Sequence, residues 1–341
     1  MTSRQRLMSA LRGDAVDRPP VVIPGGMMAG SLYAILRQAS LAYPALHIDA
    51  AAMAEYAIHL QRTCELDNYG VPFCMTVEAE DFGAGVDLGN PLKEPRVIRY
   101  PASSLDEVLA MDPVPCLRHR VTLDAISRLA GGDVPVIGNL IGPTSLLTSL
   151  VEPSVVYRAM AKDKDKIAGA FEHITGHLVR FAQRQIAAGA DVIVLADPGS
   201  SGEIIGGELF RKFVALPLNA IIRAIKACGK PAVLHICGNI LPLVEELAAI
   251  PWDALSVDSI VSLRKLKDHF PQRTLMGNVS THMMAVSNED KVYRASRRAV
   301  EISAILAPAC GLPTTTLPEN IRGMVRAARD AARKLPKRCD V

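Results

Sequence analysis

The amino-acid sequence predicts an α/β fold of the (β/α)8 barrel type, formed by residues 1–341 as one domain with a helical extension over residues 1–19. Three observations support this prediction. Short β-rich runs alternate with helical stretches from about residue 130 onward, which is typical of parallel strands joined by helical crossovers. These runs are apolar throughout, as expected for a parallel sheet that is buried on both faces. The length of 341 residues suits one such barrel with a few insertions.

Eight segments have the composition of buried strands. Two of them precede residue 130, and the other six follow it at intervals that leave room for helices. In chain order, the expected strands are 20–24, 68–73, 134–140, 191–196, 232–237, 254–258, 274–278 and 302–307. Eight such units favour a closed barrel.

Helical periodicity appears between these strands. The expected helices are 154–189, in one or two pieces, 208–229, 240–249, 288–301 and 318–335. Gly189 and Gly229 stand where the C-caps of two of these helices belong.

An open, doubly wound sheet is the alternative to the barrel. Such a sheet usually carries a glycine-rich phosphate loop after its first strand. The stretch Pro24-Gly25-Gly26 lacks the GxGxxG spacing, and the GxxxxGK[ST] pattern does not occur in the sequence. The barrel is therefore preferred.

The composition excludes several classes of partner. Lys and Arg number 38 against 35 Asp and Glu, so the net charge of +3 is too weak to predict binding to nucleic acid or to an anionic membrane. The basic segment 326–338 is interpreted as the solvated face of a last helix and its end. The uncharged run 134–151 is interrupted by prolines and glycines, which favours a strand, a turn and a helix start over a membrane span.

The N-terminus and the cysteines predict a cytoplasmic protein. Residues 1–13 carry three arginines and lack the apolar core of a secretory signal. The seven cysteines are an odd number without a disulfide framework spacing, which fits a reducing compartment.

The most informative motif is the His-x-Cys sequence of His235 and Cys237. Side chains two residues apart on a strand point to the same face, so both could bind one metal ion. They also end the expected strand 232–237, and barrel enzymes place their sites at this end of the strands. The alternative is a buried core histidine beside a buried thiol.

Cys310 supplies a third soft ligand, directly after the last expected strand. The ends of the fifth and eighth strands share one rim of the barrel. One histidine and two thiolates would leave the fourth tetrahedral position of zinc open, which distinguishes a catalytic zinc site from a structural one. The sequence therefore predicts a Zn²⁺ site formed by His235, Cys237 and Cys310.

Two aspartates are candidate catalytic residues because each ends an expected strand. Asp258 closes strand 254–258 and could act as a base beside the metal or as a reversible ligand. Asp197 follows strand 191–196 in the same way, with Glu203 shortly after it. For both aspartates, a helix N-cap or a loop salt bridge is the open alternative.

Other polar residues carry weaker signals. His173 and His177 have the i, i+4 spacing of zinc ligands, but no acidic residue stands between them as in HExxH, so we expect them at the surface or an interface. The remaining thiols have no convergent partners in the sequence and are expected to be packed or exposed, and the serines have no nucleophile elbow; these residues are Cys64, Cys74, Cys116, Cys228, Cys339, Ser145, Ser200 and Ser201.

Along nearly its whole length, the sequence resembles the methylcobamide:coenzyme M methyltransferases, which belong to the uroporphyrinogen decarboxylase superfamily. The segments that carry the resemblance are 4–20 (RQRLMSALRGDAVDRPP), 136–143 (VIGNLIGP), 192–198 (VIVLADP), 233–239 (VLHICGN) and 310–325 (CGLPTTTLPENIRGMV). The zinc pattern of these enzymes, His-x-Cys followed far downstream by Cys, is matched by His235, Cys237 and Cys310. In similar enzymes an acidic residue near Asp258 can approach the metal.

The resemblance implies a zinc-dependent transfer of a methyl group from a methylcobamide to a thiol such as coenzyme M. The corrinoid would be carried by a separate protein, because the DxHxxG signature of corrinoid carriers is absent here. Relatives that use another thiol, or that methylate the corrinoid from a methylated donor, leave the acceptor and the direction open. The decarboxylases have an arginine-rich N-terminal segment, whereas segment 19–31 has no arginine, so that activity is the lesser alternative. A metal-free barrel that only binds a tetrapyrrole is a further alternative, which zinc content would test.

Overall fold

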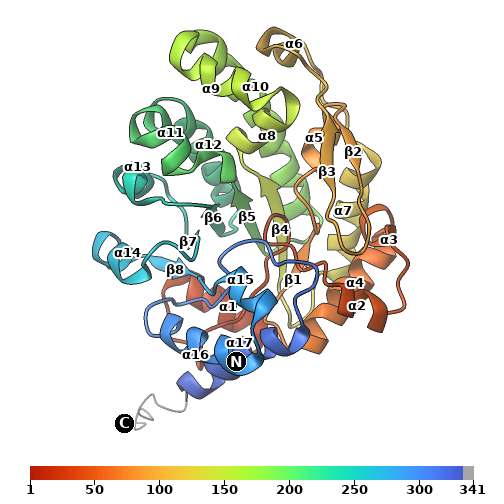
Figure 1. Ribbon diagram of the computed structural model, residues 1–341, viewed down its shortest axis with the longest axis vertical. Coiled ribbons are helices and arrows are strands. Elements are labelled where there is room, and N and C mark those ends of the chain that lie inside the picture. The colour runs from red at the N-terminus through yellow and green to blue at the C-terminus, as the bar shows by residue number, and fades with distance from the viewer. Residues whose placement is uncertain (333–341) are drawn as a thin grey trace.

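A six-stranded parallel sheet forms the centre of the computed structural model, which describes residues 1–332 (Figure 1). The strand order is β1-β4-β5-β6-β7-β8, so neighbours in space follow each other in the sequence. Each of these strands coincides with an expected one; their bounds are β1 (Tyr69–Val71), β4 (Val136–Ile141), β5 (Val192–Ala196), β6 (Ala232–Ile236), β7 (Ala254–Val257) and β8 (Thr274–Met276). The predicted α/β barrel class is confirmed.

The two remaining expected strands, 20–24 and 302–307, form isolated bridges instead of strands. Met276 pairs with Ile305, and Leu306 pairs with Val21, so the two segments close the circle between β8 and β1. The Val21 N–H donates to the side chain of Asp67, just before β1, at 2.8 Å. Prolines at 19, 20, 24 and 308 remove N–H donors that longer ladders would need, so the prediction of full strands was wrong here.

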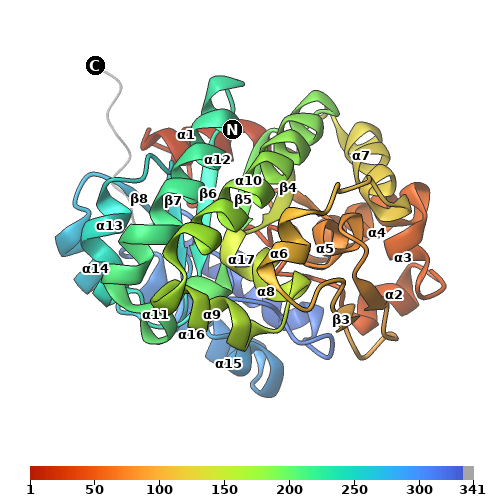
Figure 2. The same cartoon turned by 90° about the horizontal axis from the view of Figure 1, so that it is seen from above.

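Helices surround the strands, as Figures 1 and 2 show. The expected helix 154–189 is two helices, α9 (Pro153–Lys162) and α10 (Lys164–Ala187). The helices before them are α1 (Ser3–Arg12), α2 (Tyr33–Gln38), α3 (Ala45–Ile48), α4 (Ala50–Cys64), α5 (Val77–Asp81), α6 (Leu105–Leu109), α7 (Leu117–Leu129) and α8 (Pro143–Leu150).

The expected helices 208–229, 240–249, 288–301 and 318–335 are also found, with some changes of bounds. The first contains a π-helical turn, η2 (Phe210–Val214), and the last is described only to residue 332. The bounds are α11 (Gly202–Leu209), α12 (Ala215–Ala227), α13 (Val244–Ala248), α14 (Leu263–His269), α15 (Thr281–Val286), α16 (Glu289–Ala299) and α17 (Pro318–Ala332), with 3₁₀ turns η1 (Pro198–Ser200) and η3 (Leu241–Leu243). Gly189 and Gly229 follow α10 and α12 with φ of 114° and 73°, as C-terminal glycines do.

The strands separate two apolar cores. Val192 and Val194 of β5 face the interior of the barrel. The other strands except β1, and the two bridge segments, each add one or two residues to this interior core. Ile193 and Leu195 face outward and pack under the helices. This alternation follows from the two-residue period of a strand, and it fixes which side chains can reach the barrel axis.

Helix α1 closes the end of the barrel where the strands begin. Thr2 and Gln5 form a reciprocal capping box at its first turn. Its buried residues Leu7 and Leu11 join the interior core, and the Ala10 carbonyl accepts a hydrogen bond from Thr274. Because apolar side chains of α1 fill this end, polar side chains that point into the barrel lie at the opposite end, the mouth, where the strands finish.

Strands β2 (Gly85–Asp87) and β3 (Arg96–Arg99) form a separate antiparallel hairpin, at the right of Figure 1.

Over the described residues, no helix is both long and apolar enough to cross a membrane.

Candidate metal centre

His235, on β6, and Cys237, directly after this strand, lie on its interior face at the mouth of the barrel. Val233, two residues before His235, belongs to the interior core, so the strand period turns His235 and Cys237 toward the barrel axis. His235 is completely buried, and Cys237 is partly buried. The sequence expectation of a shared face is met.

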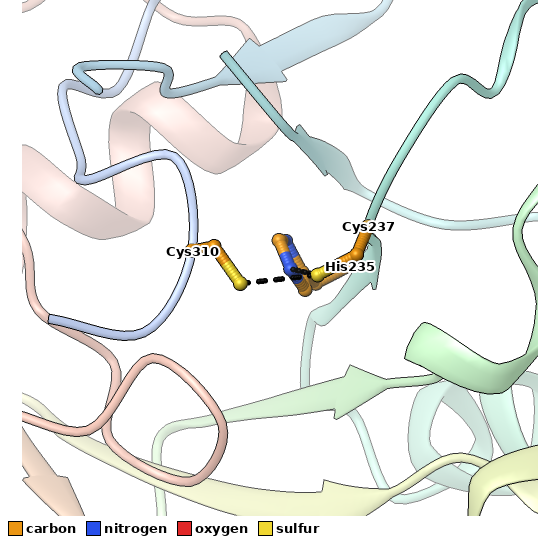
Figure 3. A group of neighbouring side chains, drawn as sticks. All are labelled: His235, Cys237 and Cys310. Atoms are coloured by element: carbon orange, nitrogen blue, oxygen red, sulfur yellow. Dashed lines mark hydrogen bonds between the residues drawn. The ribbon is translucent and has the colours of Figure 1, made fainter. Parts of the chain in front are cut away.

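Cys310 approaches from the opposite side, on the chain that follows the bridge segment 304–308 (Figure 3). Its Sγ lies 3.0 Å from Cys237 Sγ, and Cys237 Sγ lies 3.2 Å from His235 Nε2. The ligand atoms of all three residues lie within 4.8 Å of one another. The tertiary structure thus brings together the three residues that the sequence singled out.

Ser256 holds the other nitrogen of His235. His235 Nδ1 lies 2.9 Å from Ser256 Oγ, and the Ser256 hydroxyl in turn donates to Met28 Sδ at 3.7 Å. With its proton directed to Met28, the Ser256 hydroxyl can accept a hydrogen bond from Nδ1–H of His235, which is the tautomer that keeps the Nε2 lone pair for a metal. The sequence prediction missed Ser256, because its place opposite His235 depends on the register of β6 and β7.

The two thiols share a proton unequally. A hydrogen bond from Cys237 lowers the pKa of Cys310 to about 5, with a further contribution from His235. The pKa of Cys237 is raised well above its usual range, because its thiol donates to Cys310 and is partly buried. Cys310 is therefore the thiolate of the pair, and a metal would replace the proton that the sulfurs share.

The donor set fits zinc. A tetrahedral zinc ion with Zn–S bonds of about 2.3 Å needs sulfurs roughly 3.8 Å apart. The observed 3.0 Å separation of Cys237 and Cys310 needs to widen by less than about 1 Å. With three protein ligands, a fourth tetrahedral position is left for a substrate.

Asp258 lies beside this group without belonging to it. Its Oδ2 accepts a hydrogen bond from the Gly238 N–H at 3.3 Å, directly after Cys237, and its charge contributes to the raised pKa of Cys237. Its Oδ1 accepts from the Ile260 N–H. Asn278 fixes the same loop by donating to the carbonyl of Asp258 at 2.8 Å. The structure therefore places Asp258 next to the three residues, as expected from its position at the end of β7.

Asp197 points away from the group. It is fully buried, and its Oδ1 accepts hydrogen bonds from both the N–H and the hydroxyl of Ser145 at 2.7 Å. Its Oδ2 accepts from the Thr144 N–H at 3.2 Å, so the carboxylate caps the start of α8. Burial raises its pKa, while these hydrogen bonds act in the opposite direction. The contacts favour the helix-cap interpretation that the sequence left open. Glu203, the acidic residue that follows Asp197, accepts a hydrogen bond from the Asn239 N–H at 3.1 Å and so holds the loop that follows β6.

Two further residues near the mouth were not predicted as site residues. Met27 Sδ lies 3.7 Å from Cys237 Sγ. Glu94, between β2 and β3, has a pKa raised to about 7, chiefly by the surrounding protein and also by the charge of Cys310. The residue as a whole is exposed at the surface. Neighbouring protein nevertheless desolvates its carboxyl group, and desolvation disfavours the charged form. The motif Met27-Met28 hinted at such a lining, but nothing in the sequence connected Glu94 with Cys310.

The expectations for the weaker candidates need two corrections. His177 is not at the surface: it is 4% exposed and lies 2.9 Å from Asp81 on a neighbouring helix, because α10 turns this face inward. Cys74 and Cys116 do have polar partners, since Arg118 donates to Cys74 and Cys116 Sγ lies near Glu80. The other thiols are as expected or undescribed: Cys64 is buried, Cys228 is exposed, and Cys339 lies outside the described residues.

Comparison with known proteins gives full-length relatives. The chain is 28% identical over 340 residues to the methylcobamide:CoM methyltransferase MtaA of Methanosarcina barkeri, covering 96% of this chain and 98% of that protein. It is 27% identical to a methylated-thiol–coenzyme M methyltransferase of Methanosarcina mazei, covering 100% of this chain and 92% of the relative.

A solved structure agrees with these sequence relatives. A methyltransferase from Methanosarcina mazei superposes with a TM-score of 0.87 at 28% identity, covering 97% of this chain and 99% of that one. The family model described as uroporphyrinogen decarboxylase (URO-D) matches residues 2–331. The chain therefore belongs to the uroporphyrinogen decarboxylase family, and within it is similar to methylcobamide:coenzyme M methyltransferases.

Proposed function

We propose that this protein is a zinc-dependent methyltransferase that moves a methyl group from a methylated corrinoid, carried on a separate protein, to a small thiol such as coenzyme M. The observation that carries the proposal is the convergence of His235, Cys237 and Cys310 at the barrel mouth. The names of the full-length relatives support the same chemistry.

The three residues would hold the ion through His235 Nε2 and the two cysteine sulfurs. When bound, zinc would supply Lewis acidity that lowers the pKa of a coordinated thiol toward neutral pH. Ser256 keeps His235 in the required tautomer by accepting the Nδ1 proton. α1 and the interior core block the far end of the barrel, so the substrate thiol reaches this site from the mouth.

The transfer itself balances as a nucleophilic substitution. The thiol gives up its proton, its sulfur forms a bond to the methyl carbon, and the cobalt–carbon bond breaks. The electron pair of that bond stays on cobalt, which changes from Co(III) to Co(I). Asp258, next to Cys237, is the nearby carboxylate that we assign to proton acceptance and to setting the local electrostatic potential.

Methylcobalamin and a panel of thiols test this proposal. Zinc-loaded protein with 2-mercaptoethanesulfonate should convert the spectrum of methylcobalamin to that of a reduced cobalamin under anaerobic conditions. The Cys310→Ala variant should not do so, whereas Cys228→Ala, which changes an exposed thiol, should match the wild type. If no thiol is methylated while a methylated amine or ether methylates free Co(I) cobalamin, the protein catalyses the donor half-reaction instead.

A further inference from the structure

A second group of metal-binding side chains lies outside the barrel, among three of the surrounding helices. Asp81 ends α5, His119 is in the first turn of α7, and His177 is in the middle of α10. Helix α7 packs against both α5 and α10, and α7 and α10 both pack on β4. The side chains of the three residues are 0%, 2% and 5% exposed, so solvent does not reach them.

Both histidines meet the same carboxylate oxygen. His119 Nδ1 lies 2.7 Å from Asp81 Oδ2, and His177 Nε2 lies 2.9 Å from it. The other oxygen, Oδ1, accepts a hydrogen bond from the Cys116 N–H at 2.7 Å, which fixes the carboxylate in place.

Hydrogen bonding alone leaves this group incomplete. His119 Nε2 and His177 Nε2 are both buried without a hydrogen-bond partner among the described residues. For His177 the distance to Asp81 is short but the direction of the ring N–H is poor, so the contact does not satisfy the donor. A buried polar atom without a partner costs about 1–3 kcal/mol, and a metal ion beside Asp81 Oδ2 would remove this cost for His177 Nε2.

The spacing suits a metal ion. Ligands on a tetrahedral ion at about 2.1 Å are separated by roughly 3.4 Å, so the 2.7 and 2.9 Å distances around Asp81 Oδ2 need to widen by less than about 1 Å. Aromatic rings fix the imidazoles, since Phe181 lies 4.0 Å from His119 and Phe82 lies 5.1 Å from His177, centroid to centroid.

We propose that Asp81, His119 and His177 form a second metal site, which binds a divalent transition-metal ion such as zinc and has a structural role. Two imidazoles and one carboxylate are ligands that such ions accept. The ion would join α5, α7 and α10, and it would hold the start of α7. Arg118, adjacent to His119, donates from there to Thr76 and Cys74 beyond the end of β1, so the site would also stabilise one side of the mouth.

Cobalt(II) substitution separates the two sites, because thiolate ligands add an intense near-ultraviolet charge-transfer band and nitrogen and oxygen ligands do not. The wild type should bind two equivalents of metal. The Cys237→Ala/Cys310→Ala double variant should keep one equivalent, with weak visible bands and no thiolate band. His177→Gln should keep only the thiolate site. His173→Gln is the matched control, since it changes the same residue type one turn earlier on α10 and should keep both equivalents.

Two results would overturn the proposal: a metal-free Cys237→Ala/Cys310→Ala protein that remains folded, or a His177→Gln protein with the metal content of the wild type. The double variant tests the second site even where the histidine variants fail to fold, because it leaves Asp81, His119 and His177 unchanged. None of these measurements uses methyl transfer, so the second site can stand if the proposed function fails, and the reverse also holds.

Discussion

The Ser256 hydroxyl on β7 lies 2.9 Å from Nδ1 of His235 on β6, and the two residues face each other in the register of the parallel pair. This contact turns Nε2 toward Cys237 Sγ at 3.2 Å. A serine at this position therefore decides which nitrogen of His235 is available to a metal.

Replacing Ser256 by alanine should weaken metal binding without removing it. The Ser256→Ala variant keeps all three ligands but loses the group that fixes the tautomer and the ring orientation of His235, so we expect an affinity about 10–100-fold lower. Competition with a calibrated chelator measures this change. Ser127→Ala, at an exposed position on α7, is the control and should keep the wild-type affinity. An unchanged affinity in Ser256→Ala would show that the hydroxyl does not tune the site.

Removing either thiolate should empty the site at the mouth. Cys237→Ala and Cys310→Ala each leave only two soft or borderline ligands, too few for a stable zinc site. Each variant should contain one equivalent of zinc less than the wild type by metal analysis, whereas Cys228→Ala should lose none. Full retention of zinc in both variants would contradict the assignment of these ligands.

Changing Asp258 to asparagine should preserve metal binding and impair activity. Its carboxylate accepts the Gly238 N–H, which the amide oxygen of asparagine can still do, but the negative charge beside Cys237 is lost. We expect wild-type zinc content and a rate of methylcobalamin demethylation at least about 10-fold lower. A variant that purifies without this zinc would identify Asp258 as a direct ligand.

Removal of the Asp197 carboxylate should affect stability first. In Asp197→Ala the buried donors of Thr144 and Ser145 lose their acceptor, which should lower the free energy of unfolding by about 1–3 kcal/mol. Chemical denaturation measures the loss, and Asp106→Ala at an exposed position gives the baseline. A folded, equally stable variant with no activity would instead support the catalytic role that the sequence suggested.

Glu78 should make stability depend on pH. Burial raises its pKa from 4.5 to about 7, and its Oε1 accepts the Ile141 N–H at 2.9 Å. The folded protein therefore holds a proton that the unfolded chain releases between these pH values, so this residue's contribution to stability falls as pH rises from about 4.5 to 7 and stays low above it.

Glu78→Gln, which keeps the acceptor oxygen but cannot ionise, should remove that fall. The quantity to compare is the free energy of unfolding of the variant minus that of the wild type. This difference should be larger at pH 8 than at pH 5, by at most about 3 kcal/mol. Denaturation curves at the two pH values give this difference. Parallel pH dependence of the two proteins would show that Glu78 ionises normally in the folded state.

The sequence by itself determined the barrel and the chemical identity of the candidate metal centre. Apolar runs separated by helical stretches can only be buried as a parallel sheet covered by helices, and this was enough to locate every strand of the sheet. The two-residue period of a strand placed His235 and Cys237 on one face, and the glycine and proline residues around Cys310 marked the end of the last barrel segment.

The tertiary structure alone decided which face of each strand turns inward and which residues meet across the barrel. Asp258 is four residues after the inward Ala254 and so points to the mouth, whereas Asp197 is three residues after the inward Val194 and so points out to α8. Side chains alternate between the two faces in any strand, but these runs are apolar throughout, so the sequence does not show which residues turn inward. Asp81, His119 and His177 come from three helices far apart in the chain, and only the packing of those helices brings them to one oxygen atom. Local periodicity carries no information about such contacts, because they depend on register and packing between elements that are distant in sequence.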